Sequence, residues 1–272
     1  LEDHQALHVD FLSLSGKEFV RHADALQSDD VDVHLAQAIL RRWNCMMLPD
    51  SDGASVFKVA MYHLVRAVVG SMLDDDLTLN YMGRGPHALL LPTSEFDGHS
   101  TVAMLALMDD PDSLWLKQAG GHDVVLAQAL KDAITYLRDQ FGSDTRQWGW
   151  GRLHQVVFPH SMAIQPPMDR VFNIGPFPTG GDGDTVCQTA YQAATPYMAN
   201  ACAPSFRQIV DMGDLDGALY STPPGQSGQL GSEHYDDLAE PWLRGEYCQP
   251  PWSRAEVEAT CKAQMTLRPE SD

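Results

Sequence analysis

Residues 148–158 read Trp-Gly-Trp-Gly-Arg-Leu-His-Gln-Val-Val-Phe, and at this stretch the character of the chain changes. Upstream of it, apolar residues recur at the three- and four-residue steps of amphipathic helices. Downstream of it, Gly and Pro interrupt short apolar runs, as in residues 175–178 and 222–225. The sequence therefore predicts an α+β chain with helices first and antiparallel strands second, divided into a mainly helical region 1–147 and a β-rich region 148–272.

Two segments of the first half, residues 54–73 and 124–141, carry the clearest helical pattern. We expect Asp52 and Asp123 to cap the starts of these helices, and Gly142 to end the second one in the left-handed conformation. The apolar stripes, which we expect to face a core, are Phe57, Met61, Leu64, Val65, Val68 and Met72 in the first segment and Leu126, Leu130, Ile134, Leu137 and Phe141 in the second.

Weaker patterns predict further short helices. Residues 17–26 and 32–42 show the same periodicity over fewer turns. A last helix is expected at about residues 253–264, because Ser253 is followed three residues later by Glu256, the pattern of a capping box.

A hairpin is predicted in the second half of the chain. Residues 205–212 are rich in side chains that favour strands, and a second run of this kind follows at residues 218–221. Gly and Asp make up most of the intervening residues 213–217, which we expect to form the turn.

The net charge excludes two classes of partner. The 272 residues include 18 basic and 37 acidic side chains, which gives a formal charge of −19. Such a chain is repelled by nucleic-acid phosphates and by anionic lipid surfaces. There is also no apolar run long enough for a transmembrane helix. The acidic runs at Asp74–Asp76 and Asp109–Asp110 are interpreted as solvated loops, with a metal site as the less favoured alternative.

The five cysteines form no CxxC pair, so the sequence does not indicate a zinc ribbon or a redox dithiol. Cys187 could pair with Cys202 and Cys248 with Cys261, and the odd number leaves at least one thiol over. The chain begins at Leu1 without a start Met or a basic leader segment. The chain is therefore either a mature, processed chain or a fragment; we favour processing, and we expect a periplasmic or secreted protein.

Motifs that would indicate catalysis by themselves are missing, among them GxSxG, the P-loop and HExxH. Ser227 lies between glycines in residues 225–228, where a tight turn is a better interpretation than a nucleophile. The acidic glycine-rich run 180–184 lacks the ligand spacing of an EF-hand, and we interpret it as an acidic turn.

Histidines and tryptophans of the second half have structural interpretations too. His154 and His160 would lie on one side of a strand if that strand ran unbroken between them. His234 is expected to donate to a nearby carboxylate such as Asp237, and Trp148 and Trp150 are expected to fill a core.

Four short motifs, in matching order and spacing, resemble the penicillin amidase family. The stretch 148–158 is similar to the family's W-x-W-G-x-x-H-x-x-x-F. The other three are the glycine-rich G-G-D-G-x-T turn at residues 180–185, S-[YF]-R at residues 205–207, and G-Q-S-G … S-x-H-Y-x-D at residues 225–237. In the helical half the similarity is limited mainly to Val9-Asp10 and Trp43.

The resemblance implies the fold and the chemistry of that family. It implies that the chain is the C-terminal portion of the large chain of an N-terminal nucleophile hydrolase, an enzyme with an αββα fold. The precursor of such an enzyme cuts itself into two chains. The new amino-terminal serine attacks the amide, with its own amino group as the base and an Asn and a backbone N–H as the oxyanion hole. Leu1 carries no nucleophile, and the family's Asn, Arg and calcium ligands precede the segment similar to Leu7–Asp10.

The catalytic serine is therefore expected on a companion chain from the same precursor, and no catalytic or metal-binding residue is assigned to this chain. No cofactor is required, and any calcium is expected on the companion chain. Gln208 matches a position where related acylases place a Glu or Gln that supports the active site, although a solvent-facing strand residue is an equal interpretation.

The substrates implied are small N-acyl compounds, namely acyl-homoserine lactones or β-lactams such as penicillin G, and Gln208 favours the lactone branch. The resemblance thus implies quorum quenching or antibiotic degradation by an autoproteolytically processed heteromer. The alternative is a non-catalytic scaffold or binding module that shares the fold.

Overall fold

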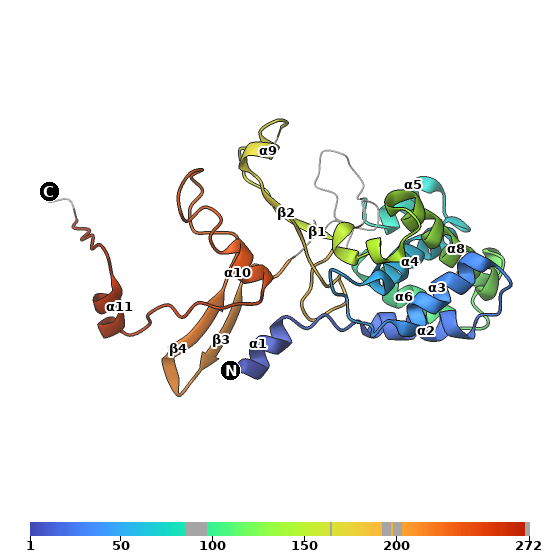
Figure 1. Cartoon of the computed structure of the whole chain (residues 1–272), viewed down its shortest axis with the longest axis horizontal. Coiled ribbons are helices and arrows are strands. Elements are labelled where there is room, and N and C mark those ends of the chain that lie inside the picture. The colour runs from blue at the N-terminus through green and yellow to red at the C-terminus, as the bar shows by residue number, and fades with distance from the viewer. Residues whose placement is uncertain (85–96, 164, 192–196, 198–202, 270–272) are drawn as a thin grey trace. The chain divides into compact units, whose positions relative to one another are not determined.

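The computed structural model describes residues 1–84, 97–163, 165–191, 197 and 203–269. The chain forms two compact units (Figure 1). The larger is Val9–Pro204, and the smaller combines Leu1–His8 with Ser205–Asp272. The predicted division at residues 147 and 148 falls inside the larger unit, where it marks the end of the long helices, and as a domain boundary it stays a prediction.

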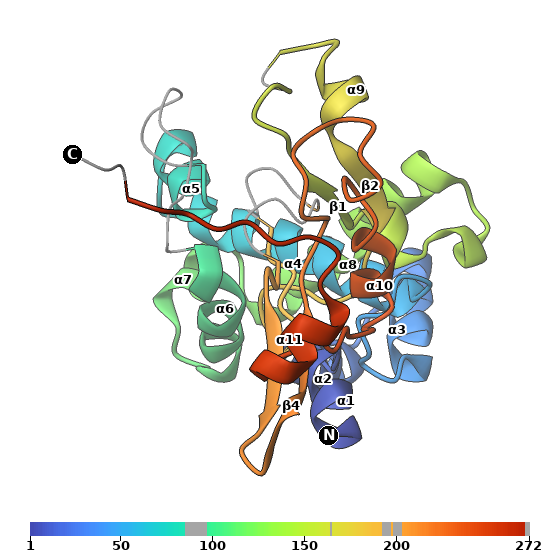
Figure 2. The ribbon, with the colours of Figure 1, turned by 90° about the vertical axis from the view of Figure 1, so that its left-hand side faces the viewer.

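The larger unit is built around the helix α4, which packs against α3 and α8 (Figure 1). Figure 2 shows α6 and α7 next to each other, in green. The α-helices of the first half of this unit are α2 (Leu14–Ala25), α3 (Val31–Arg42), α4 (Asp52–Gly70), α5 (Asp75–Tyr81), α6 (Ser100–Asp109), α7 (Leu114–Gln118) and α8 (His122–Phe141). The four helices expected from periodicity in the first half are therefore confirmed, as α2, α3, α4 and α8.

Helix α4 is buried on almost every side. Its cap is Ser51, whose Oγ accepts a hydrogen bond from the Ala54 backbone N–H at 3.1 Å. The expectation of Asp52 as the cap is wrong by one position, and Asp52 is instead the first helical residue, where its charge still meets the helix dipole. Met72 does not belong to the buried stripe, because the helix ends at Gly70 and leaves this side chain 50% exposed.

Helix α8 buries most of the predicted stripe, since Leu126, Leu130, Ile134 and Leu137 are all inaccessible to solvent and Phe141 is partly buried. It begins at His122 after Gly121, so the prediction that Asp123 caps it is wrong. Gly142 ends the helix, as predicted, with φ +82°, but its ψ of −179° lies outside the left-handed helical region that was expected. None of the helices in the described part of the chain combines the length and apolar character needed to cross a bilayer.

The acidic runs are exposed as expected, but they are not loops. Asp74 caps α5, with Oδ1 accepting from the Leu77 backbone N–H at 2.8 Å, and the following acidic residues form the first turn of that helix. Asp109 is the last residue of α6. Carboxylates at a helix start complement the positive end of the helix dipole.

After α8 the larger unit contains short 3₁₀ turns and one small antiparallel hairpin. Its strands are β1 (Gln155–Phe158) and β2 (Ile174–Pro178), with the helix α9 (Asp169–Phe172) before β2. His154 precedes β1 and His160 follows it, so one unbroken strand through both histidines is not formed. Pro159 ends the strand, because it has no N–H to continue the ladder. The 3₁₀ turns after α8 are η2 (Thr145–Gln147) and η3 (Trp150–Arg152), and another, η1 (Asp97–His99), precedes α6.

The smaller unit contains the predicted hairpin, formed by β3 (Arg207–Asp211) and β4 (Asp214–Ser221). The turn is shorter than expected and consists of Met212 and Gly213, because Asp211 Oδ1 accepts from the Gly213 N–H at 2.8 Å and closes the chain at once. The helices of this unit are α1 (Glu2–His8), α10 (Ala239–Leu243) and α11 (Arg254–Thr260).

Two further expectations concern the smaller unit, and one of them is confirmed. Ser253 caps α11 and accepts from the Glu256 N–H, as the capping-box pattern predicts. Cys248 and Cys261 are both free thiols, so the pairing considered for them is not formed. Cys202, the partner considered for Cys187, lies outside the described residues.

Candidate functional site

A buried ion pair lies at the centre of the larger unit. Lys58 Nζ on α4 is 3.1 Å from Asp182 Oδ2, and the two side chains are 5% and 0% exposed. Asp184 Oδ2 is 4.0 Å from the same nitrogen. The rings of Phe57 and Tyr191 lie with their centroids 5.2 and 5.4 Å from it. The carboxylates and the aromatic rings compensate the Lys58 ammonium group for the loss of its hydration shell.

The glycine-rich run 180–184 forms an acidic turn, as expected, but this turn lies in the interior of the larger unit. Asp182 is fully buried, and Lys58 supplies the counter-charge that makes this burial possible. The sequence pattern alone does not show that these two residues are neighbours. Its other oxygen, Oδ1, accepts from the Asp184 backbone N–H at 2.8 Å. Thr185 Oγ1 accepts from the Asp182 N–H at 3.0 Å, which closes the loop on itself.

Charges in this cluster shift the pKa values of their neighbours. Burial alone would lower the pKa of Lys58, but Asp182, Tyr191 and Asp184 together outweigh it and raise the pKa of Lys58 above its ordinary value. Burial raises the pKa of Asp184, and Lys58 only partly opposes this. The lysine therefore stays charged at neutral pH, and the pair cannot relax by neutralising it.

The Trp-Gly-Trp-Gly stretch packs directly against this loop. Trp150 Nε1 donates to the Gly181 carbonyl at 2.9 Å, and the Gly151 N–H donates to the Pro49 carbonyl at 2.7 Å. A Cβ on Gly151 would lie 2.8 Å from Pro49 Cβ, so only glycine allows this approach. Trp148 and Trp150 are both fully buried, which confirms their predicted place in the core.

His154 joins the same cluster from the end of this motif. Its ring is fully buried and stacks on Trp150, with centroids 4.6 Å apart and planes tilted by 13°. Nδ1 donates to the Tyr197 carbonyl, and Nε2 lies 2.9 Å from Thr189 Oγ1. Burial lowers the pKa of His154 to about 4, so the imidazole is neutral at neutral pH.

The hydroxyl of Thr189 has two acceptors within reach. It lies 2.6 Å from the Gly180 carbonyl and 2.9 Å from the neutral nitrogen of His154. Because a hydroxyl carries one proton, it satisfies one acceptor at a time. The Thr189 hydroxyl therefore connects two of the motifs that resemble the family, the one that contains His154 and the one around Gly181.

A small cavity of about 80 Å³ adjoins the cluster. Lys58, Tyr62, Thr101, Asp184 and Tyr191 are among its lining residues. Its size suits water or a small polar group and not an acyl chain, since ligand pockets usually measure several hundred Å³. The arrangement can hold a fixed charge pair in place, and the described residues around it form no open substrate pocket.

The motifs of the smaller unit form a second, separate arrangement. A Cβ on Gly225 would lie 2.4 Å from the His234 carbonyl oxygen, so the two parts of the motif touch through their backbones. The Ser227 N–H donates to that carbonyl at 2.9 Å, and Ser227 Oγ accepts from the Gln229 N–H at 3.1 Å. His234 Nδ1 lies 2.9 Å from Asp237 Oδ2, as predicted. Ser227 therefore stabilises a turn, in line with our preferred interpretation.

Strand β3 carries the remaining candidate. Arg207 is buried and donates to the Trp242 carbonyl at 2.9 Å. Gln208, the next residue, is exposed in this chain, and its Nε2 donates to the Tyr220 hydroxyl at 3.1 Å. A supporting role for Gln208 at an active site stays a prediction.

Lys58 and Thr189 were missed by the sequence interpretation. A signal for Lys58 was present, because it stands alone among apolar residues in a helix predicted to be buried, and a buried lysine needs a carboxylate. No comparable signal exists for Thr189, whose role depends on a loop closing over a distant histidine.

The fold can be compared with solved structures. The chain matches the thermostable penicillin G acylase from Alcaligenes faecalis with a TM-score of 0.52 at 16% identity, over 97% of this chain and 48% of that chain. The fold class is therefore α+β, the C-terminal portion of an N-terminal nucleophile hydrolase, as predicted. The penicillin amidase family model matches residues 1–259, so the chain belongs to the penicillin amidase family.

The chain is also similar to curated relatives named acyl-homoserine lactone acylase QuiP. It is 31% identical to that of Pseudomonas syringae pv. syringae over 170 residues, which is 61% of this chain and 20% of the relative. The Pseudomonas putida protein is 33% identical over 127 residues, or 47% of this chain and 15% of the relative. The chain spans about one fifth of the length of the curated relatives that it matches.

Proposed function

We propose that this chain is part of an amide hydrolase that removes the acyl side chain from N-acyl-homoserine lactones. Membership of the penicillin amidase family supports amide hydrolysis. The names of the curated relatives favour the lactone over a β-lactam such as penicillin G. The observation that carries the proposal is the family match over residues 1–259 together with these relatives.

We further propose that the attacking serine is the first residue of a companion chain from the same precursor. The contacts of three side chains that could take part in catalysis, Lys58, His154 and Ser227, support this proposal. Lys58 neutralises Asp182, both ring nitrogens of His154 have partners inside the protein, and Ser227 closes a turn. These groups are committed to internal structure, so in this proposal the nucleophile and its base come from elsewhere.

This chain then acts as a rigid support. The ion pair, the stacked Trp150–His154 pair and the glycine contacts hold the loop 180–185 against α4 and the residues before it. A nucleophile must be held within fractions of an ångström of its target, and buried, fully paired contacts provide that rigidity. We also propose a periplasmic or secreted location, which fractionation of the producing cells would test.

Reconstitution of the enzyme from its parts tests the function. The 272-residue chain and the upstream part of its precursor are incubated with an N-acyl-homoserine lactone, separately and together, and released homoserine lactone is measured by mass spectrometry. We expect release only from the mixture. Intact mass should show a companion chain that begins with serine.

The other outcomes contradict specific parts of the proposal. Full activity of this chain alone would refute a companion nucleophile. A mixture with the expected masses that hydrolyses neither the lactone nor penicillin G would favour the non-catalytic scaffold. Hydrolysis of penicillin G without hydrolysis of the lactone would place the substrate in the β-lactam branch.

A further inference from the structure

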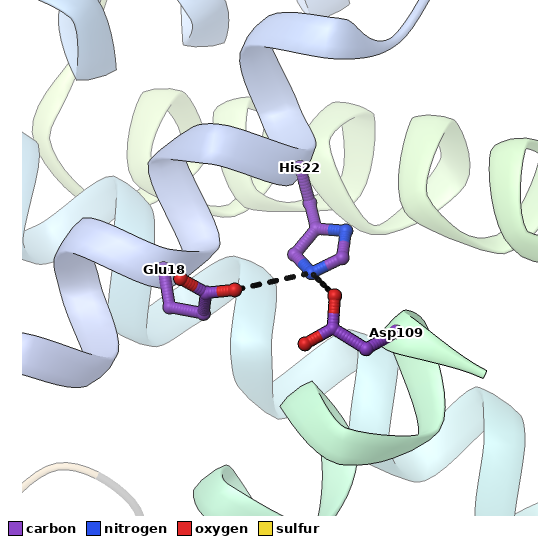
Figure 3. Close-up of side chains that lie close together, drawn as sticks. All are labelled: Glu18, His22 and Asp109. Atoms are coloured by element: carbon purple, nitrogen blue, oxygen red, sulfur yellow. Dashed lines mark ion pairs between the residues drawn. The ribbon is translucent and has the colours of Figure 1, made fainter.

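Three groups that can bind a cation converge on one point of the larger unit, away from the buried ion pair. Glu18 and His22 lie one turn apart on α2, and Asp109 ends α6 (Figure 3). His22 Nε2 is 3.4 Å from Asp109 Oδ1 and 4.0 Å from Glu18 Oε1. The His22 side chain is only 6% exposed, although both carboxylates reach solvent.

A cationic nitrogen already lies among these three groups. Arg21 Nη2 donates to Glu18 Oε1 and to Asp109 Oδ1, and it lies 3.1 Å from His22 Nε2. A guanidinium group only donates hydrogen bonds and does not lose its proton in proteins. His22 Nε2 must therefore be the acceptor, so its lone pair points at the same place as the two carboxylate oxygens.

The other nitrogen of His22 is fixed by a relay of hydrogen bonds. Because Nε2 accepts, the ring proton is on Nδ1, which donates to His122 Nε2 at 3.2 Å. The proton of His122 is then on its Nδ1, 2.7 Å from Asp123 Oδ1. Carboxylate–histidine contacts of this type orient the histidines that bind metals in proteins.

We propose that Glu18, His22 and Asp109 form a binding site for Zn²⁺, in which the metal displaces Arg21 from between the three groups and lies closer to His22 Nε2 than the 3.1 Å of Arg21 Nη2. One imidazole nitrogen and two carboxylate oxygens suit zinc, whereas calcium and magnesium require about six oxygen ligands. Two ligands of a tetrahedral ion, each about 2.1 Å from it, lie about 3.4 Å apart. The observed separations of 3.4 and 4.0 Å are close to this value.

Arg21 can leave this position at little cost. Its side chain is 55% exposed, and ion pairs at the surface contribute little to stability. His22 and Asp109 also line a surface hollow with Arg21, Asp110 and His122, which gives a water access as the fourth ligand. Bound zinc would tie α2 to α6 and, through the relay, to the start of α8. This inference does not depend on the proposed enzymatic function.

Zinc titration of the metal-free 272-residue chain, followed by calorimetry and by thermal unfolding, tests the proposal. We expect saturation at one Zn²⁺ per chain. At a zinc concentration 100 times Kd, Tm should rise by about 5 °C or more. Calcium at the same concentration should leave Tm unchanged. Absence of zinc binding to the wild-type chain would overturn the proposal.

Single variants locate the binding. Glu18→Gln and Asp109→Asn change exposed side chains and should each weaken binding at least tenfold, and His122→Gln, which removes the relay, by about tenfold. Arg21→Gln should bind zinc more tightly than the wild type, because the competing cation is gone. Wild-type affinity in both Glu18→Gln and Asp109→Asn, or no gain in Arg21→Gln, would overturn this site.

His234→Gln is the matched control. His234 also has two neighbouring carboxylates, but Glu233 lies near Nε2 and Asp237 near Nδ1, so one ion cannot use both together with the ring. This variant should bind zinc like the wild type. If its binding falls as much as that of Asp109→Asn, the zinc is held by surface histidines in general and the proposal fails.

Discussion

Lys58 Nζ lies 3.1 Å from Asp182 Oδ2 in the interior of the larger unit, and this contact joins helix α4 to the glycine-rich loop 180–185. Removing one partner would leave an unpaired buried charge, which costs about 3–5 kcal/mol. Lys58→Met should therefore lower the free energy of unfolding by that amount, measured by urea denaturation.

Two further variants check the cause of this loss. The double variant Lys58→Met with Asp182→Asn should cost less than the sum of the two single variants, because no unpaired charge is left. Lys131→Met is the matched control, since Lys131 pairs with Asp30 at 2.8 Å at the surface and should cost less than about 1 kcal/mol. Equal losses in Lys58→Met and Lys131→Met would contradict the importance of burial.

His154 should make the stability of the chain depend on pH. Its folded-state pKa is about 4, below the unfolded value of 6.5, so between these values the unfolded chain binds a proton that the folded chain does not. Its contribution is complete above pH 6.5 and is lost as the pH falls towards 4. The loss amounts to about 3 kcal/mol.

Urea denaturation of the wild type and of His154→Gln at several pH values measures this effect. The variant should be less stable at neutral pH and should show a smaller decrease between pH 6.5 and 4. Asp237 raises the pKa of the exposed His234, so His234→Gln should leave the decrease unchanged. An identical pH dependence in His154→Gln and wild type would show that burial does not lower the pKa of His154.

Gly181 and Gly142 provide a matched pair for the role of the glycine-rich motif. Both have φ +82°, and alanine at either position is strained by about 1–3 kcal/mol. A Cβ on Gly181 would also lie 2.5 Å from the Cys187 carbonyl oxygen, whereas a Cβ on Gly142 has open space. Gly181→Ala should therefore be clearly less stable than Gly142→Ala in thermal or urea unfolding. Equal stabilities would mean that the loop 180–185 shifts to make room for the added Cβ, which would contradict its close packing.

Ser227→Ala separates a turn residue from a nucleophile. Loss of the hydrogen bond from Gln229 N–H to Ser227 Oγ should cost about 1 kcal/mol or less. In the enzyme reconstituted with its companion chain, the rate of lactone hydrolysis should stay within about twofold of the wild type, which corresponds to a small change in activation energy. A loss of several orders of magnitude would place the nucleophile on this chain.

Much of the fold could be predicted from local patterns. The buried stripe of α8, from Leu126 to Leu137, follows from periodicity alone, and the hairpin β3–β4 follows from two runs of strand-forming residues around glycine. Short elements such as α5–α7 and the β1–β2 pair were not predicted, and the predicted ends of some elements were wrong. Ser51 caps α4 in place of Asp52, because two adjacent residues can both accept from the first N–H groups and only the backbone conformation selects one.

The candidate site was predictable only in part. The motifs around His154 and Gly181 were identified from their resemblance to one family, yet their contact with Lys58 was not foreseen. An acidic glycine-rich run has the same composition whether it lies in water or against a buried lysine. The cation site of Glu18 and His22 was hidden for a similar reason, since Asp109 belongs to another helix.

By itself, the sequence determined the longer helices, the β3–β4 hairpin and the family, because helical periodicity, strand composition and motif spacing are properties of neighbouring residues. The tertiary structure alone decided which charges meet, among them Lys58 with Asp182 and His22 with Asp109. Burial sets the energy of such charges, and burial depends on how segments far apart in the chain pack together.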